Sequence, residues 1–178
     1  LFWGGDQWHY REPNTIHDLF CMWGKDINNI HAVGGEGTYR FHDGKQFQRR
    51  DDLTSEEVSL YGIWGAAADD VYIVGSHGTI LHFDGNEDGE WKTMESGTEE
   101  YLLGIWGSSS TNIFAVGDNA TILHYDGKSW TPMDAGTEKY LTKVRGLRSD
   151  CVYAVGDDGL VVRFDGEKWI DMSLGGNV

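Results

Sequence analysis

Four copies of one sequence pattern occupy most of this 178-residue chain. The glycine that closes the first phrase of each copy recurs after 41, 42 and then 39 residues, at Gly24, Gly65, Gly107 and Gly146. A period of about 40 residues is typical of solenoids, propellers and other arrays, in which each unit buries its apolar surface against its neighbours. The repeat therefore limits the possible folds more strongly than any other feature of the sequence.

Each copy divides into four short segments separated by residues that favour turns. In the second copy these segments are residues 60–65, 71–75, 79–83 and 90–94. Segments rich in Val, Ile, Tyr, Phe and Trp, bounded by Gly, Asp, Asn and Ser, are typical of β-strands. The VGSHG, VGDNA and VGDDG junctions are so short that they can only be the turns of β-hairpins. No segment shows helical periodicity over a useful length. The pattern predicts an all-β fold with four antiparallel strands in each copy.

The alternation within the strands predicts how the copies pack. In the second copy Val71 and Ile73 project to one face of the sheet, and Tyr72 and Val74 to the other. Because both faces are apolar, each sheet is expected to lie between two others, as the blades of a β-propeller do. A parallel β-helix would have shorter, uniform coils and no Trp-bearing fourth strand, so we favour the propeller.

The repeat boundaries predict a single β-propeller domain over residues 1–178. A half-blade (1–18) precedes four complete blades, at residues 19–59, 60–101, 102–140 and 141–178. Residues 1–8, LFWGGDQW, match residues 123–130, LHYDGKSW, and so predict the last two strands of a preceding blade. A closed five-blade ring would need about 205 residues, some 27 more than are present. We expect a longer parent chain, another chain or another copy to complete the half-blade.

Composition excludes several classes of partner. The chain carries 29 acidic and 14 basic residues, a formal net charge of −15. Such a surface repels phosphate backbones and anionic membranes, so we expect no nucleic-acid partner. No apolar run approaches the roughly 18 residues of a membrane span, so we expect no membrane insertion. The two cysteines, Cys21 and Cys151, stand at different phases of the repeat, which does not imply a disulfide bond.

The recurring aromatic residues and histidines have two interpretations each. Tryptophan recurs at the end of the first strand and in the fourth strand, at Trp23, Trp64 and Trp106 and at Trp8, Trp91, Trp130 and Trp169. These rings could form platforms for ligands, but residues that recur in every blade usually belong to the scaffold, where they fill the wedge between sheets. His82 and His124 could ligate metal, yet each has its Asp on another face, so we favour packing and hydrogen bonding.

The turns after the second strands supply candidate ligand-binding residues. They are expected to lie together on one rim of the disc, and their variable polar residues are Glu36, His77, Asp118, Asn119, Asp157 and Asp158. Variable polar residues on a rigid ring are typical of propeller binding faces. Their acidity would favour cations or a basic partner, although acidic turns can equally serve solubility alone.

An insertion in the second copy suggests a calcium site. Where other copies read DGKSW or DGEKW, this one reads DGNEDGEWKTME, and the spacing of a calcium loop is satisfied by Asp84, Asn86, Asp88, Gly89 and Glu95. Alternate oxygen ligands would converge on one cation, with Glu95 closing the loop. Lys92 at the ninth position and the predicted strand before Glu95 count against this, and a solvated acidic hairpin is the alternative. Calcium is the only cofactor that the sequence suggests.

The phrase WGSSSTNIFAVGDNATILHYDGKSW (106–130) resembles the repeat of bacterial secreted β-propellers related to Asp-box and photosystem II assembly-factor propellers. The shared motif is W-G-x(3–5)-[DN]-[VI]-[YFH]-x-V-G followed by D-G-x-x-W, and it covers essentially the whole chain. The resemblance implies an extracellular, cell-surface or periplasmic location and a binding role without catalysis. The Ser or Thr of the sialidase Asp-box is missing, because its positions hold Phe41, His82, His124 and Arg163.

The favoured function is therefore a non-catalytic scaffold that presents an acidic loop face to a protein partner, and a larger complex is one form that this partnership could take. A glycan-binding, lectin-like propeller is the first alternative. The second is a hydrolase with carboxylates in the central channel. No G-x-S-x-G motif and no phosphate-binding glycine loop is present, so we do not expect an enzyme.

Overall fold

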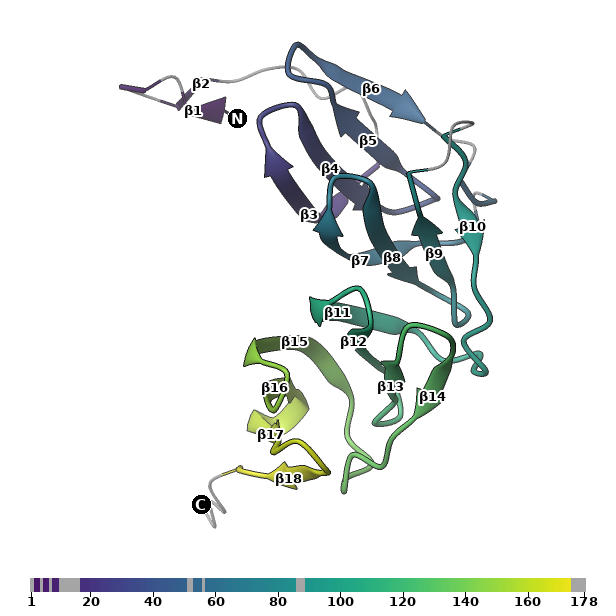
Figure 1. Ribbon diagram of the computed structural model, residues 1–178, viewed down its shortest axis with the longest axis vertical. Helices are drawn as coiled ribbons and strands as arrows, with labels where there is room; N and C mark the ends of the chain where they lie inside the picture. Colours follow the sequence, from purple (N-terminus) through teal and green to yellow (C-terminus); the bar gives the residue numbers. More distant parts are fainter. Residues whose placement is uncertain are drawn as a thin grey trace.

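A computed structural model describes residues 2–3, 5–6, 8–9, 17–50, 53–55, 57–85 and 89–173. These residues form four four-stranded antiparallel sheets and one two-stranded sheet. In each large sheet the strands pair in sequence order, and the four sheets follow one another along an arc (Figure 1). The predicted all-β propeller of four blades and a half-blade is confirmed. None of the described residues belongs to a helix of the length and hydropathy that a membrane crossing requires.

The half-blade consists of β1 (Phe2–Trp3) and β2 (Trp8–His9). The strands of the four blades are, in order, β3 (Leu19–Asp26), β4 (Asn29–Gly34), β5 (Tyr39–His42) and β6 (Phe47–Arg50); β7 (Leu60–Ala67), β8 (Asp70–Gly75), β9 (Ile80–Phe83) and β10 (Lys92–Thr93); β11 (Leu102–Ser109), β12 (Asn112–Gly117), β13 (Ile122–Tyr125) and β14 (Trp130–Pro132); β15 (Leu141–Arg148), β16 (Cys151–Gly156), β17 (Val161–Phe164) and β18 (Trp169–Asp171).

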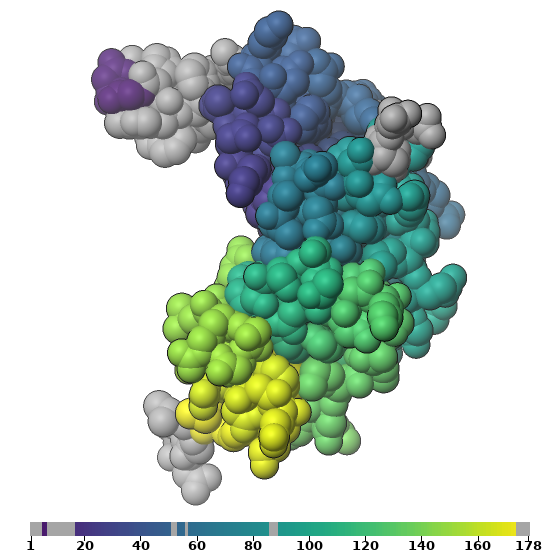
Figure 2. Space-filling view, in the orientation of Figure 1, coloured from purple at the N-terminus to yellow at the C-terminus, as the bar shows by residue number. Residues whose placement is uncertain are grey.

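The first strands of the blades lie nearest the axis of the arc. β3 contacts β7, β7 contacts β11, and β11 contacts β15. Figure 1 shows these strands on the concave side and the fourth strands on the convex side. The space-filling view shows the same succession of blades, with the arc open on one side (Figure 2).

One strand differs from its prediction. The fourth strand of the second blade was predicted at residues 90–94 but is limited to Lys92 and Thr93, which pair with His82 and Leu81. The insertion that precedes it lengthens the connection from β9, so that less of the segment is held in the ladder. Trp91 lies before the strand, and its ring packs edge-on against Tyr39 of the first blade, with centroids 5.5 Å apart.

The core consists of three interfaces between blades, because each sheet is apolar on both faces. One cluster joins the first and second blades, and it includes Val33, Tyr39, Ile63, Val71 and Ile73. A second joins the second and third blades through Trp64, Tyr72, Val74, Ile105 and Ile113. A third joins the third and fourth blades through Phe114, Val116, Val144, Val152 and Ala154. The predicted assignment of alternate residues to opposite faces agrees with these clusters. In the second blade, for example, Val71 and Ile73 face the first blade, and Tyr72 and Val74 face the third.

A tryptophan lies over a glycine at each of these interfaces. A Cβ atom added to Gly65 would lie 2.6 Å from the ring of Trp23, one on Gly107 would lie 2.7 Å from Trp64, and one on Gly146 would lie 2.3 Å from Trp106. Real Cβ atoms do not approach other atoms so closely, so only glycine fits beneath each indole. The scaffold interpretation of the first-strand tryptophans is therefore correct in these three blades.

The recurring histidines also belong to the scaffold. The His82 ring stacks on Tyr72 with centroids 4.1 Å apart, and its Nε2 lies 2.8 Å from Asp70 Oδ1. His124 makes the equivalent contact with Asn112, at 2.7 Å. In the first blade the histidine lies on the second strand, β4, instead of the third. This residue, His31, is buried, and its Nδ1 lies 2.8 Å from the Tyr39 hydroxyl. The two cysteines, Cys21 and Cys151, are free thiols.

We expect Gly107→Ala to destabilise the protein because its methyl group would collide with Trp64. The loss in free energy of unfolding should be about 1–3 kcal/mol, as for other overpacked cores, and denaturant titration would measure it. Gly24→Ala is the matched control, since the nearest atoms to a Cβ there lie at 3.2 Å and belong to its own hairpin, at Asn29 and Ile30. Equal losses in the two variants would contradict the indole-on-glycine contact.

Acid should weaken the fold through His31. Burial lowers the pKa of this imidazole from 6.5 to about 4, so the folded state favours the neutral ring. The associated stability is complete above pH 6.5 and is lost as the pH falls towards about 4, a change of about 3 kcal/mol. The measurement is the pH dependence of the free energy of unfolding. His31→Phe introduces the residue that the third blade has at the same position, Phe114. This variant should lose less free energy of unfolding over the same pH range, and identical pH profiles would refute the assignment to His31.

Candidate binding rim

The turns after the second strands share one backbone geometry. The middle residues Glu36, His77, Asn119 and Asp158 have φ values of 53°, 54°, 49° and 52°. The residues that follow them also have positive φ, as two-residue type I′ hairpins require. Residues 157–159 are assigned as a single helical turn, but the left-handed backbone at Asp158 makes it the same hairpin. These residues project from the tips of rigid turns, and all four are exposed.

Each turn is tied to the start of its own blade. The amide nitrogens of Gly35, Ser76, Asp118 and Asp157 donate hydrogen bonds to the carbonyls of Asp18, Ser59, Tyr101 and Tyr140, at 2.9–3.1 Å. Each of these carbonyls belongs to the residue immediately before a first strand. The structure therefore places all six predicted rim residues beside the first-strand starts, on one surface that we name the turn rim (residues 18–20, 35–37, 59–61, 76–78, 100–101, 118–120, 140 and 157–159).

Hydrogen bonds also link the turn rim from blade to blade. The amide of Gly37 donates to the Val58 carbonyl at 2.6 Å, and the amide of Gly78 donates to the Glu100 carbonyl at 2.9 Å. In both cases the acceptor lies in the segment that leads into the next blade. Asn119 then donates its side-chain amide to Glu100 Oε1 at 2.9 Å. The rim is thus a fixed surface, and its side chains stand at defined positions.

A row of aromatic rings runs along the turn rim. Phe20 stacks on Tyr61 with centroids 5.6 Å apart, and Tyr61 stacks on Tyr101 at 6.1 Å. His77 packs edge-on against Tyr101 at 5.3 Å. Phe20, Tyr101 and Tyr140 are 47%, 37% and 46% exposed. Most of the aromatic rings whose surroundings the structure describes pack between blades, so these exposed ones form a distinct apolar surface.

Carboxylates gather beside the aromatic row, where the third and fourth blades meet. Burial raises the pKa of the Asp118 carboxyl above its usual value, and the nearby charges of Glu100 and Asp157 raise it further. Like charges that are held together in this way attract a cation, because a positive group relieves their repulsion. Two of the rim carboxylates already have basic neighbours: Glu36 lies 3.4 Å from His17, and Asp158 lies 3.6 Å from Lys139. Both pairs have an exposed carboxylate and contribute little to stability.

The aromatic part of the rim was not predicted from the sequence. The variability of the turns indicated the turn residues but gave no sign of Phe20, Tyr61, Tyr101 and Tyr140. Their signal was available in the repeat, since each blade has an aromatic residue either just before its first strand or at the second position of it. Antiparallel pairing places these positions at the same edge as the turns.

The predicted calcium loop lies partly outside the described residues, which include neither Asn86 nor Asp88. Of the other predicted ligands, Asp84 pairs with the ammonium group of Lys92, and Glu95 is exposed beyond β10. The described residues contain no group of three or more His, Cys, Asp or Glu side chains arranged to hold a metal ion. A calcium ion at this loop would have to compete with Lys92 for the Asp84 carboxylate.

The hydrolase alternative depends on carboxylates that face one another across a channel. The carboxylates that the described residues bring together, Glu100, Asp118 and Asp157, lie instead on the turn rim of adjacent blades.

Comparison with known proteins supports the fold alone. No model of a known protein family matches the chain, and no curated protein sequence matches it significantly. Solved structures do match. One is described as YCF48 bound to D1 peptide, with a TM-score of 0.72 and 16% identity over 92% of this chain and 56% of that one.

Two further structures show the same architecture. YCF48 from Cyanidioschyzon merolae has a TM-score of 0.66 and 13% identity, covering 94% of this chain and 63% of its own. The WD40 repeats of RRP9 have a TM-score of 0.68 and 7% identity, covering 86% and 52%. The chain thus spans between half and two thirds of the length of these structures. At such low identity the likeness establishes one point: the chain has the fold of a β-propeller.

Proposed function

We propose that this chain is a non-catalytic binding module whose turn rim holds a basic, extended segment of a protein partner. The observation that carries the proposal is the stacked row of Phe20, Tyr61 and Tyr101 beside the carboxylate cluster at Asp118. Phe20 and Tyr101 are exposed, and Tyr61 between them is half-buried. Aromatic faces and carboxylates together recognise Arg and Lys side chains, through cation–π contacts and charge-assisted hydrogen bonds.

The charge of the whole chain supports the same class of partner. A net charge of −15 attracts basic proteins over a distance of about a Debye length and accelerates their association. The rim is also long enough for an extended segment, because the aromatic row crosses from the first blade to the third. A rigid surface of this kind binds with little loss of conformational entropy on its own side.

Structures of similar fold are compatible with this role. One neighbour is described as bound to a peptide, and we propose a peptide ligand for this chain by the same use of the fold. The resemblance to secreted bacterial propellers, an extracellular, cell-surface or periplasmic location and membership of a larger complex stay predictions.

A glycan ligand is the second candidate, and the exposed aromatic row is the observation that favours it. Flat rings stack on the apolar faces of sugars, and Tyr101 and Tyr140 would present their faces with a hydroxyl at the edge. A glycan array separates the two candidates. Binding of neutral sugars that is insensitive to salt would replace the basic-peptide proposal.

Neutralising the carboxylate cluster should weaken the binding of a basic peptide. We expect Asp118→Asn, Asp157→Asn and Tyr101→Ala each to reduce the affinity for a fluorescent Arg-Gly peptide about two- to fivefold, as for other exposed charge and cation–π contacts. Fluorescence anisotropy at low and high salt is the measurement. Because the raised pKa of Asp118 penalises its ionised form in the folded protein, Asp118→Asn should also unfold at a slightly higher temperature at neutral pH.

The matched control is Glu167→Gln, which removes an exposed charge from the turn between β17 and β18, at the opposite edge of the fourth blade. Glu167→Gln should leave the affinity unchanged. An equal loss in this control would show that the peptide responds only to net charge. A peptide of the same length with Glu in place of Arg should not bind, and its binding would exclude the cationic site.

We also propose, as a separate point, that calcium binding at residues 84–95 can be decided by thermal unfolding. If Asp84 and Glu95 are ligands, excess calcium should raise the unfolding midpoint and chelator should lower it. Removing the competing cation with Lys92→Gln should strengthen the effect, since the ion pair between Lys92 and Asp84 is then absent. If neither calcium nor chelator changes the unfolding midpoint of the wild type or of the variant, residues 84–95 do not bind calcium.

A further inference from the structure

The indole-on-glycine contact leaves one glycine without its tryptophan. At Gly65, Gly107 and Gly146, the indole of the preceding blade lies where a Cβ atom would be. At Gly24, which holds the same position in the first blade, the nearest atoms to such a Cβ are Asn29 O and Ile30 Cγ1, both at 3.2 Å and both in its own hairpin. No described indole lies over Gly24.

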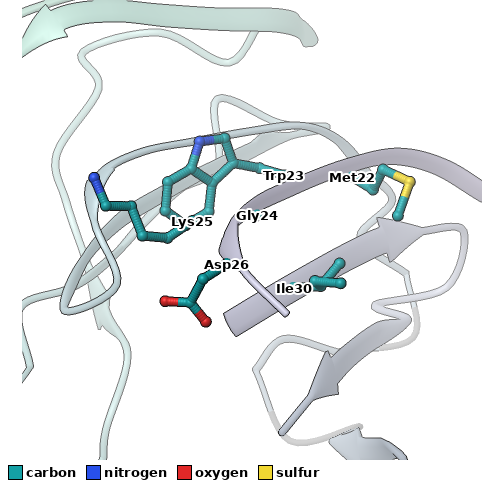
Figure 3. Close-up of a pocket in the computed structure, with 6 residues that line it drawn as sticks. All are labelled: Met22, Trp23, Gly24, Lys25, Asp26 and Ile30. Carbon is teal, nitrogen blue, oxygen red and sulfur yellow. The ribbon is translucent and has the colours of Figure 1, made fainter. Parts of the chain in front are cut away.

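The surface around Gly24 is an open hollow of about 340 Å³. It is lined by Met22, Trp23, Gly24, Lys25, Asp26 and Ile30 (Figure 3). Register with β4 places Ile30 opposite Gly24. The corresponding residues of the third blade, Ile105, Gly107 and Ile113, enclose Trp64 in the core between the second and third blades. The hollow therefore has the apolar walls of an indole site that is filled elsewhere in the molecule.

Exposure confirms that this face lacks its cover. Met22 is 62% exposed, whereas the residues at the same position in the next three blades, Ile63, Ile105 and Val144, are 3%, 4% and 3% exposed. Leu19 and Ile27, at the two ends of the hollow's strands, are 47% and 68% exposed. Large apolar side chains that are exposed side by side mark an interaction site.

We propose that the hollow at Gly24, here named the indole socket, binds a tryptophan delivered by a two-stranded β-hairpin of this repeat type. The hairpin would supply the first and second strands that the half-blade lacks. Within the described residues β1 pairs only with β2, whereas every other third strand pairs with a second strand as well. The second strand of the hairpin would therefore form backbone hydrogen bonds with the edge of β1. The tryptophan on its first strand would contact the indole socket.

The chain itself defines the chemistry of the ligand. Residues 1–8 match residues 123–130, and in that complete blade the first two strands lie within residues 102–122, with Trp106 followed by Gly107. A second copy docking through its last blade is a poorer occupant. That blade carries Arg145 instead of tryptophan at the end of its first strand, so it brings no indole to the socket.

The test adds a synthetic peptide of residues 102–122 to the full chain. We expect saturable binding, measured by anisotropy of a labelled peptide, and an affinity at least about tenfold lower for the peptide with Trp106→Ala, as for other tryptophan anchors. Gly24→Leu, which fills the indole socket, should reduce the affinity as strongly. Its unfolding midpoint without peptide should stay within a few degrees of the wild type, because nothing described covers that site.

A fusion of the peptide to the chain provides a second test, which still works if the free peptide associates with itself. Duplicating residues 102–122 directly before Leu1 should raise the unfolding midpoint by at least about 4 °C, and Gly24→Leu in the same chain should abolish the rise. The proposal is overturned if the fusion gives no rise, or if the peptide binds equally well to wild type and Gly24→Leu. It is also overturned if sedimentation shows that the unmodified chain dimerises through this face, since the occupant would then be a second copy.

Binding of the Arg-Gly peptide at the turn rim is independent of this test. Gly24→Leu should leave that binding unchanged, so failure of the indole socket and failure of the proposed function are distinguishable. If the Arg-Gly peptide and the hairpin compete, the two sites overlap and the separate assignment of the socket is wrong.

Discussion

The contact between a tryptophan ring and a glycine backbone is the interaction on which this fold depends. Neighbouring sheets approach most closely near the axis, where a Cβ atom beneath the indole would lie 2.3–2.7 Å from it. The large ring fills the space that twisted sheets leave between them, and glycine allows it to do so without strain. The pair recurs at all three interfaces between the four blades, because each interface joins the same two faces of the repeat.

The same constraint separates scaffold from function. Residues that recur at one phase, such as Trp23, Trp64 and Trp106, pack in the interfaces between blades. Residues that vary at one phase lie on the turn rim, where the backbone is fixed by hydrogen bonds and the side chains are free to differ. The rigid ladder thus presents a variable surface, and the carboxylate cluster around Asp118 shows the cost, since burial and like charges disfavour its ionised form.

The indole socket and the turn rim follow from opposite properties of the repeat. The socket is a place where the pattern is incomplete, because Gly24 has the walls of an indole site without an indole over it. The rim is a place where the sequence varies between copies, because the position of Tyr101 and Tyr140 holds Asp18 and Ser59 in the first two blades. Both features are visible only when the four blades are compared with one another position by position.

The sequence by itself determined the all-β class, the four blades and half-blade, and the faces to which alternate residues project, because these follow from a 40-residue period and a two-residue alternation. It also placed the turn residues on one rim, since hairpins of equal length end at the same edge. Only the tertiary structure decided the short β10, the pairing of Lys92 with Asp84, and the aromatic row from Phe20 to Tyr101. These depend on distances between blades, which a repeat pattern does not encode because it describes one blade at a time.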